Sequence, residues 1–496
     1  MADFEVHLLD PGAIEYGDCV LCLSDDKSIL IDGGKKASAK TTRDTVLGRD
    51  IIHSPIQDQI ESLHGSTEID LLIITHCHSD HIGNLPALFT NGTLTCEWAL
   101  IADPQFGYGI GGDSGPIPPV DQMSPAEKLW LALREEPIHS SDVAAIREFI
   151  EDAASQYHEY VALVEFLEEK LGSRCVRYKG PSEADSTGLD ALLANFAGTG
   201  LNILGPSLRQ LGNCAKFLVG RSEDVAEIAI DPALTREGRV DLVDAYRREL
   251  QAGTSVSVSV VGAVDAAEDT PENGNAVNNQ SMVLTIGHGP ARALLTGDMQ
   301  FANPQLSDAG VREEMQALRE ALAADVEQNG PFGFIKLSHH GATNGQNATL
   351  LRAWGGTLYG ISTGSGSSKH PTAPTLNTLK AAADSGAKWG RTDLNGRVTY
   401  RVKAGRRSLL KERGRWNDLT LPARRAGDAA PSEPAAEAPP GTTPLPPLPA
   451  PAVAPETVSA FHTESGNVEV TVKFPFGKGK VTVTIETGGE ETPPLT

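Results

Sequence analysis

Short apolar runs separated by polar turns recur along most of the chain. Runs of strand length lie at residues 4–9, 18–23, 29–31, 69–74, 98–102, 201–204, 283–286, 293–295, 334–337 and 358–361. Residues 310–326 instead carry Val311, Met315, Leu318 and Leu322 on one stripe at helical spacing. Because strand-length runs alternate with helical stretches, the pattern predicts an α/β fold.

A long central region differs from this pattern. Residues 124–171 carry apolar side chains at helical spacing, and acidic residues outnumber basic ones there. We expect a helical insertion over about residues 120–200, which would serve as a lid or as a partner-docking surface. Residues 207–253 are also expected to be mostly helical, whereas residues 256–264 are strongly β-branched.

The C-terminal part of the chain changes in composition. Residues 423–456 are rich in alanine and proline, which is typical of an extended, semi-rigid linker. Within residues 457–496, two segments at 468–474 and 480–485 alternate strictly between apolar and polar side chains, which predicts a β-hairpin. Two strands alone are marginally stable in water, so we expect this interaction segment to pair with another chain or to dock on the main domain of residues 1–422.

Composition and charge limit the environment and the partners. The 496 residues are 40% hydrophobic, with no apolar run long enough to span a membrane and no signal-peptide pattern at the start, so a cytoplasmic protein is expected. The net charge of −23 opposes long-range attraction of a nucleic acid, although bound cations can reverse the potential locally. The same charge also suits solubility or a basic protein partner.

The strongest chemical signal follows the apolar run at residues 69–74. His76, His78, Asp80 and His81 are four potential metal ligands within six residues. At the end of a strand, His76 and His78 point the same way because side chains alternate with period two, so they can hold one cation. Asp80 and His81 come after the chain turns, and can face a second cation. Two divalent ions about 3.5–4 Å apart form a hydrolytic site, and this ligand set suits zinc, manganese or iron.

Three more strand ends carry candidate site residues. Asp298 follows a buried strand and a glycine, which suits a carboxylate that bridges two metals. His339 and His340 end a third strand; adjacent residues in extended chain face opposite sides, so only one of them is expected to bind metal. Lys369 and His370 follow a glycine- and serine-rich loop that is suited either to binding an anionic group or to a plain surface role.

The spacing of the first motif resembles the His-x-His-x-Asp-His signature of the metallo-β-lactamase superfamily. Within it, the chain is similar to the soluble domain of ComEC-type DNA-uptake proteins, in residues 32–34, 75–81, 278–281, 295–298, 338–341, 370–371 and 391–396. The resemblance implies a four-layer αβ/βα sandwich with two divalent cations, zinc or manganese, held by the first motif, Asp298 and one histidine of the next pair. It favours His340 over His339, and implies that Asp32 braces the metal loop by hydrogen bonds.

The activity implied by the resemblance is metal-dependent hydrolysis of a phosphodiester in DNA or RNA, with water activated on the cations and with Asp80, Asp298 and His370 taking part. Hydrolysis of a small ester, lactone or phospho-substrate is the alternative on the same site. A scaffold subunit of a defence or repair system, recruiting a protein through the acidic insertion or the C-terminal hairpin, is a third possibility. One departure concerns the first metal, because Asn278 and Asn279 stand where many members have a third histidine.

Overall fold

The computed structural model divides the chain into two compact units, residues 1–430 and 431–496. In the first unit it describes residues 3–422, apart from 25, 47, 109–118, 124–127, 129–130, 133, 136–142, 220–269, 307 and 385. In the second unit it describes three strands. The predicted linker, the β-branched stretch at 256–264 and most of the helical prediction over 207–253 therefore lie outside the described residues.

The first sheet contains eight of the described strands. In spatial order they are β16 (Arg406–Lys411), β15 (Val398–Lys403), β1 (Phe4–Leu8), β2 (Val20–Ser24), β3 (Ser28–Ile31), β6 (Glu68–Ile74), β7 (Thr95–Ala102) and β8 (Cys175–Tyr178). Strands β3, β6, β7 and β8 run parallel to one another, and the remaining neighbours are antiparallel. The apolar run at 69–74 is therefore an interior strand, β6.

The second sheet contains six of the described strands. In spatial order they are β14 (Lys388–Arg391), β13 (Leu358–Ile361), β12 (Phe334–Lys336), β11 (Ala293–Leu295), β10 (Val283–Ile286) and β9 (Asn202–Gly205). Strands β11 to β14 are parallel, so their carboxyl ends meet at one edge. A separate hairpin pairs β4 (Thr42–Val46) with β5 (Arg49–His53).

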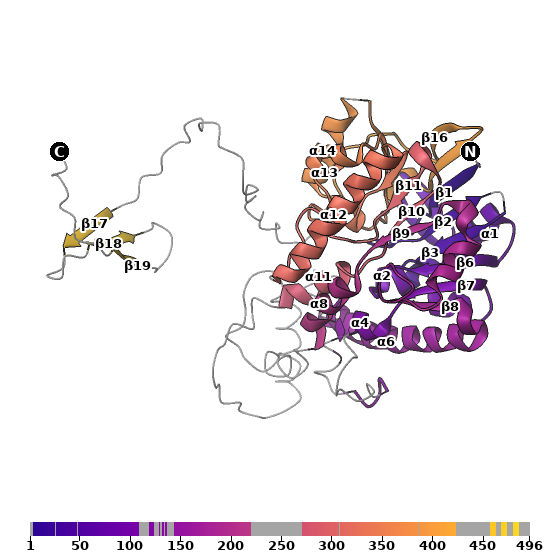
Figure 1. Ribbon diagram of the computed structural model, residues 1–496, viewed down its shortest axis with the longest axis horizontal. Coiled ribbons are helices and arrows are strands. Elements are labelled where there is room, and N and C mark those ends of the chain that lie inside the picture. The colour runs from indigo at the N-terminus through magenta and orange to yellow at the C-terminus, as the bar shows by residue number, and fades with distance from the viewer. Residues whose placement is uncertain are drawn as a thin grey trace. The chain divides into compact units, whose positions relative to one another are not determined.

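Three apolar clusters hold together the sheets and helices of the first unit, whose arrangement is drawn in Figure 1. One cluster joins the facing sides of the two sheets, where Leu71 and Ile73 of β6 meet Leu295 and Phe334. A second joins the other side of the first sheet to α1 (Ile56–His64), α3 (Leu85–Thr90), α6 (Val143–Leu171), α8 (Leu208–Val219) and α11 (Thr270–Asn278). A third joins the outer side of the second sheet to α12 (Ala309–Asn329), α13 (Ala348–Trp354) and α14 (Ala373–Ala383). The fold is mixed α/β, as the sequence predicts.

Shorter helices connect these elements. They are α2 (Ser79–Ile82), α4 (Pro104–Gly107), α7 (Leu189–Asn195) and α15 (Thr392–Asn395), with the 3₁₀ turns η1 (Lys36–Ala39), η2 (Gly172–Arg174), η3 (Ala197–Thr199), η5 (Gly289–Ala291) and η6 (His339–Gly341). Within the part of the chain that the structure describes, no helix combines the length and the apolar character needed to span a membrane.

The region expected to be a helical insertion differs from that expectation. Its long helix, α6, buries Tyr160, Leu163 and Val164 against the outer side of the first sheet, so this helix is part of the main core. The following segment forms β8, which pairs in parallel with β7 and extends the same sheet. Sequence periodicity reveals the helix but not the four-residue strand, whose partner lies about 75 residues earlier.

The second unit contains a three-stranded antiparallel sheet rather than the predicted two-stranded hairpin. Strands β18 (Val468–Lys473) and β19 (Lys480–Ile485) pair where the alternating pattern places them. The third strand, β17 (Thr457–His462), pairs with β18. Its mixed composition gives no clean alternation, and the sequence prediction missed it for that reason.

Candidate metal centre

The candidate site residues follow the carboxyl ends of parallel strands in both sheets. Asp32 follows β3, and the motif from His76 to His81 follows β6. Asp298 follows β11 and His340 follows β12. Because the facing sheets are packed on a common core, these loops meet at one end of the two layers. Such carboxyl-end edges are the usual ligand-binding positions of parallel sheets.

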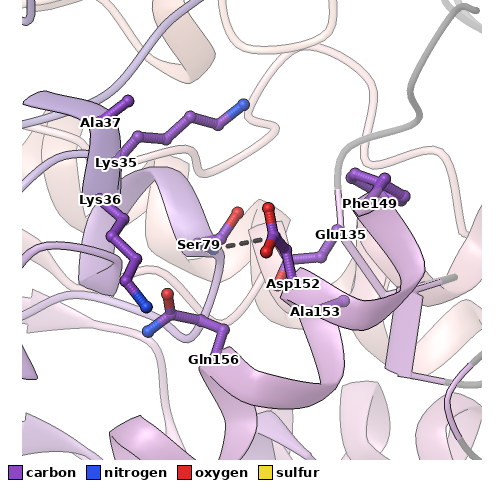
Figure 2. A pocket seen from close by; sticks show the side chains of 9 residues that line it. All are labelled: Lys35, Lys36, Ala37, Ser79, Glu135, Phe149, Asp152, Ala153 and Gln156. Atoms are coloured by element: carbon purple, nitrogen blue, oxygen red, sulfur yellow. Dashed lines mark hydrogen bonds between the residues drawn. The ribbon is translucent and has the colours of Figure 1, made fainter. Parts of the chain in front are cut away.

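A pocket of about 180 Å³ lies beside the loop that follows β6 (Figure 2). Its lining includes Lys35, Lys36, Ser79, Glu135 and Asp152. The backbone N–H of Ser79, the residue before Asp80, donates to a Glu135 carboxylate oxygen at 2.8 Å. The pocket therefore adjoins the candidate metal loop and carries both positive and negative side chains.

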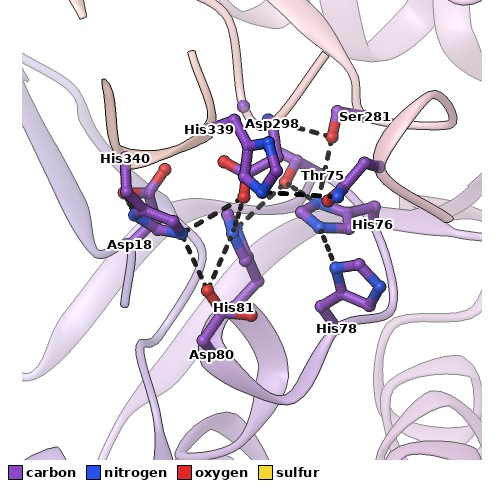
Figure 3. A network of polar contacts seen from close by, with 12 residues as sticks. Asp18, Thr75, His76, His78, Asp80, His81, Ser281, Asp298, His339 and His340 are labelled. Carbon is purple, nitrogen blue, oxygen red and sulfur yellow. Dashed lines mark hydrogen bonds and ion pairs between the residues drawn. The ribbon is translucent and has the colours of Figure 1, made fainter. Parts of the chain in front are cut away.

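Four ligand residues converge behind this loop. Ligand atoms of Asp80, His81, Asp298 and His340 all lie within 4.8 Å of one another, and all four side chains are buried. The Nε2 atom of His340 lies 2.8 Å from an Asp80 oxygen and 3.1 Å from Oδ2 of Asp298. The Nε2 atom of His81 lies 3.3 Å from the same Asp298 oxygen. We call these residues the four-residue cluster (Figure 3).

Hydrogen bonds to neighbouring residues fix the imidazole rings of His81 and His340. Nδ1 of His81 donates to Oδ2 of Asp32 at 2.7 Å, and Nδ1 of His340 donates to the Ser362 carbonyl at 2.8 Å. Asp32 also accepts from the N–H and hydroxyl of Thr75 at 2.8 and 2.7 Å. With Nδ1 occupied in this way, both histidines direct Nε2 at the carboxylates, as metal-ligating histidines do.

Opposite charges dominate the electrostatics of the cluster. Burial by itself lowers the pKa of His340, but the carboxylates of Asp298 and Asp80 outweigh it and raise the pKa to about 10. Burial opposes the charging of His81 in the same way, yet Asp298, Asp80 and Asp32 raise its pKa well above the ordinary value. Burial acts to raise the pKa of Asp298, whereas His340 and His81 lower it well below the usual range. The buried carboxylates thus require positive charge beside them.

A divalent cation fits this donor set. Among the described residues, Nε2 of His81 and both carboxylate oxygens of Asp298 are buried and make no hydrogen bond of good geometry. Buried polar atoms are ordinarily satisfied, so this arrangement favours another species that joins them. Two imidazole nitrogens and two carboxylates suit zinc, manganese or iron, and a cation would replace the protons that otherwise balance the charge.

His76 and His78 form a separate pair beside the cluster. Nε2 of His76 lies 3.2 Å from Nδ1 of His78. Two imidazole nitrogens on one tetrahedral zinc lie about 3.3 Å apart, given zinc–nitrogen distances of about 2.0–2.1 Å. Nε2 of His78 donates to the Arg134 carbonyl at 2.6 Å, which leaves Nδ1 as the ligand atom. Within the described part of the chain, the pair belongs to no group of three His, Cys, Asp or Glu ligands.

The neutral state of His76 also suits a metal ligand. Burial, and then the neighbouring imidazoles of His81 and His78, lowers the pKa of His76 well below its ordinary value. Its Nδ1 lies 3.1 Å from the hydroxyls of both Thr75 and Ser281. The Ser281 hydroxyl in turn accepts the backbone N–H of Asp298 at 3.0 Å, so it links this pair to the four-residue cluster.

The two asparagines at the position of the missing third histidine have other contacts. The Asn279 side-chain amide donates to the Asn275 carbonyl at 2.7 Å and to Gln300 at 3.0 Å. The Asn278 amide nitrogen lies 3.5 Å from Nε2 of His339. The structure therefore adds no imidazole or carboxylate from this segment to the pair of His76 and His78.

His339 and His370 lie outside the four-residue cluster. Nδ1 of His339 lies 2.8 Å from the side-chain oxygen of Asn344. Both histidines of the η6 turn have a left-handed backbone, with φ of 50° and 48°, rather than the extended conformation assumed from the sequence. The His370 ring lies 5.4 Å from that of His339, 5.7 Å from that of Tyr16 and 6.3 Å from that of His340.

The sequence reasoning missed two charged residues of the site. The Lys336 ammonium is buried, forms an ion pair with Asp18, and lies 3.8 Å from Oδ1 of Asp298. Oδ1 of Asp18 lies 3.6 Å from Nδ1 of His340. The available signal was a lysine inside the apolar run at 334–337, because an unpaired charge in a buried strand is costly and implies a partner.

Comparison with known proteins does not assign the chain to a family. No protein-family model matches the chain, and no curated protein is significantly similar to it.

Proposed function

We propose that the chain is a metal-dependent hydrolase of metallo-β-lactamase type, with zinc or manganese as its cations and a nucleic acid phosphodiester as its substrate. The observation that carries the proposal is the four-residue cluster, whose ligand atoms come from three separate strand ends and lie within 4.8 Å of one another. A site assembled from such distant segments indicates a selected arrangement rather than an accident of one loop.

The layer order supports the αβ/βα sandwich implied by the sequence resemblance. Helices cover the outer side of each sheet, and the two sheets face each other through one apolar cluster. The ligand-bearing loops also follow the strands in the order that the resemblance implies, with the His76–His81 motif first, Asp298 next and His340 last.

The chain's own residues have definite roles in this proposal. Asp80, His81, Asp298 and His340 would hold one cation, and His76 with His78 would hold the second. Bound divalent cations lower the pKa of water and neutralise charge on phosphoryl oxygens. Asp32 keeps the proton on Nδ1 of His81, so that Nε2 remains a ligand atom.

The surroundings of the cluster support an anionic substrate. Lys35 and Lys36 line the pocket beside Ser79. The Lys35 ammonium lies 4.7 Å from the Tyr16 ring centroid, and that ring lies 5.1 Å from the His340 ring. Lys36 pairs with Glu159 at 2.6 Å, so the Lys35 ammonium is the group that would offset negative charge where a phosphodiester approaches. His370, whose ring lies 6.3 Å from that of His340, would contact the substrate beside the cluster.

The proposal is tested with purified full-length protein. Metal content is measured first, and the protein is then assayed on labelled single-stranded DNA, duplex DNA and RNA and on small ester and lactone substrates. We expect metal-dependent shortening of a nucleic acid by the wild type and none by the Asp80→Ala/Asp298→Ala double variant. Asp308→Asn, which alters only the carboxylate that caps α12, is the matched control and should remain active.

Other results of this assay would change the proposal. Ester or lactone cleavage without nucleic acid cleavage would assign the same site to a small-molecule hydrolase. An absence of bound metal and of any hydrolysis would remove the enzyme proposal.

The second unit supports a role in binding a protein partner. It forms a compact unit with a sheet of its own, separate from the unit that contains the metal centre. Pull-downs with the full chain and with a chain ending at residue 422 test this role. A partner retained by both chains would place the contact in the first unit instead.

A further inference from the structure

The buried ion pair of Lys336 and Asp18 lies directly beside the four-residue cluster. Lys336 is the last residue of β12, and Phe334, two positions earlier, lies in the cluster of apolar side chains between the sheets. Because side chains alternate along a strand, Lys336 also faces that inter-sheet space. Asp18 reaches it from the loop before β2 of the first sheet.

The Lys336 ammonium makes two further contacts, one with Gly297 and one with Asp298. It donates to the Gly297 carbonyl at 3.1 Å, and it lies 3.8 Å from Oδ1 of Asp298. Gly297 has a left-handed φ of 50°, which glycine adopts readily, and its buried carbonyl also accepts the backbone N–H of His339 at 3.2 Å. The other carboxylate oxygen, Oδ2, faces His81 and His340.

We propose that Lys336 is a positioning residue for the metal centre. It holds the Gly297 peptide and one oxygen of Asp298, and thereby directs the second oxygen to the cation. Asp18 balances the charge of the ammonium, so that the pair adds no net charge to the site. This inference rests on the cation proposed for the four-residue cluster.

Positioning and simple charge effects predict opposite changes in metal affinity. If Lys336 acted only as a nearby positive charge, its removal would strengthen cation binding. If it directs Asp298, its removal weakens binding by about 10-fold to 100-fold, which is the usual effect of removing a residue that orients a metal ligand. The direction of the change therefore decides between them.

The experiment uses metal-stripped full-length protein titrated with Co²⁺, whose visible absorption reports both affinity and ligand geometry. Lys336→Met should weaken Co²⁺ binding and alter the spectrum. Lys336→Met/Asp18→Asn removes both charges, so it should fold better than the single variant and yet still bind Co²⁺ weakly. Lys27→Met breaks the 3.0 Å ion pair with Asp70, which lies near the amino ends of β3 and β6, whereas the metal centre lies at their carboxyl ends. This variant should bind Co²⁺ like the wild type.

Two results would overturn the inference while leaving the proposed function intact. The first is wild-type or tighter Co²⁺ binding by Lys336→Met. The second is full recovery of affinity in the double variant, which would reduce the pair to a charge-balancing role. Failure of the wild type to bind Co²⁺, Zn²⁺ or Mn²⁺ would instead remove the metal centre, and the inference with it.

Discussion

The two halves of the His76–His81 motif share one loop but have different surroundings. Asp80 and His81 are joined by Asp298 and His340 from the second sheet, and the hydrogen bond that His81 donates to Asp32 fixes the His81 ring. His76 and His78 face each other without a third side-chain ligand among the described residues that could complete a group. The difference shows that the motif supplies pairs of potential ligands, whereas long-range packing determines which pair gains further ligand residues in the described part of the chain.

Asp298→Asn changes a ligand residue of the four-residue cluster, and it should have the largest effect of the variants considered. The amide loses one negative charge from a buried donor set, and it also leaves a side-chain N–H facing the imidazoles. We expect hydrolysis to fall by more than the roughly 100-fold that loss of an orienting residue costs. The assay compares initial rates with the wild type and with Asp308→Asn; a rate near that of the wild type would contradict the placement of Asp298 at the site.

His340→Ala and His78→Ala sharpen the comparison directly. Calorimetric titration of stripped protein with Zn²⁺ should show one tight and one weak equivalent in the wild type, because only one half has four ligands. His340→Ala should lose the tight equivalent, and His78→Ala should lose the weak one. If the two variants lose the same equivalent, the halves do not bind separate cations.

Asp32→Asn should have a smaller effect, because it removes no direct ligand of the cluster. The neutral amide still accepts a hydrogen bond from His81 but supports the ring less strongly than a carboxylate. We expect metal affinity to fall by about 10-fold, at the lower end for such residues. Measurement of the tight Zn²⁺ equivalent checks this, and unchanged affinity would mean that packing alone orients His81.

Glu5→Gln provides a metal-independent reference and the smallest effect. The hydrogen bond from His7, with help from Arg401, lowers the pKa of Glu5 to about 2 against an opposing effect of burial. A lowered pKa stabilises the fold above the unfolded-state pKa of about 4.3, and this contribution is lost as the pH falls toward 2.

The partly exposed Glu5 should therefore contribute only about 0.5 kcal/mol to the free energy of unfolding at pH 7. Thermal melts of the Glu5→Gln variant and the wild type should converge as the pH falls to about 2, with or without chelator. A difference between them that depends on the chelator would contradict its role as a reference.

Local pattern was sufficient for much of the fold and for part of the site. Alternation and run length placed β6, β11 and β12, because each is a continuous apolar run that ends in polar residues. Strand β8 escaped prediction because its partner β7 lies about 75 residues earlier in the chain, and β17 escaped because its residues do not alternate cleanly.

The same limit applied to the site. The spacing of His76 to His81 indicates metal ligation by itself, but the contacts of Asp18 and Lys336 arise only when the two sheets pack face to face. His339 lies outside the cluster in a left-handed turn, and two adjacent histidines in a sequence do not predict such a turn.

The four-residue cluster draws Asp80 and His81 from the loop after β6 of one sheet, and Asp298 and His340 from loops of the other. A cation bound by these side chains would link the two sheets. At a free concentration 100 times its dissociation constant, this cation would add about 2.7 kcal/mol to the free energy of unfolding. The lifetime of the folded chain in a cell would then rise and fall with metal supply.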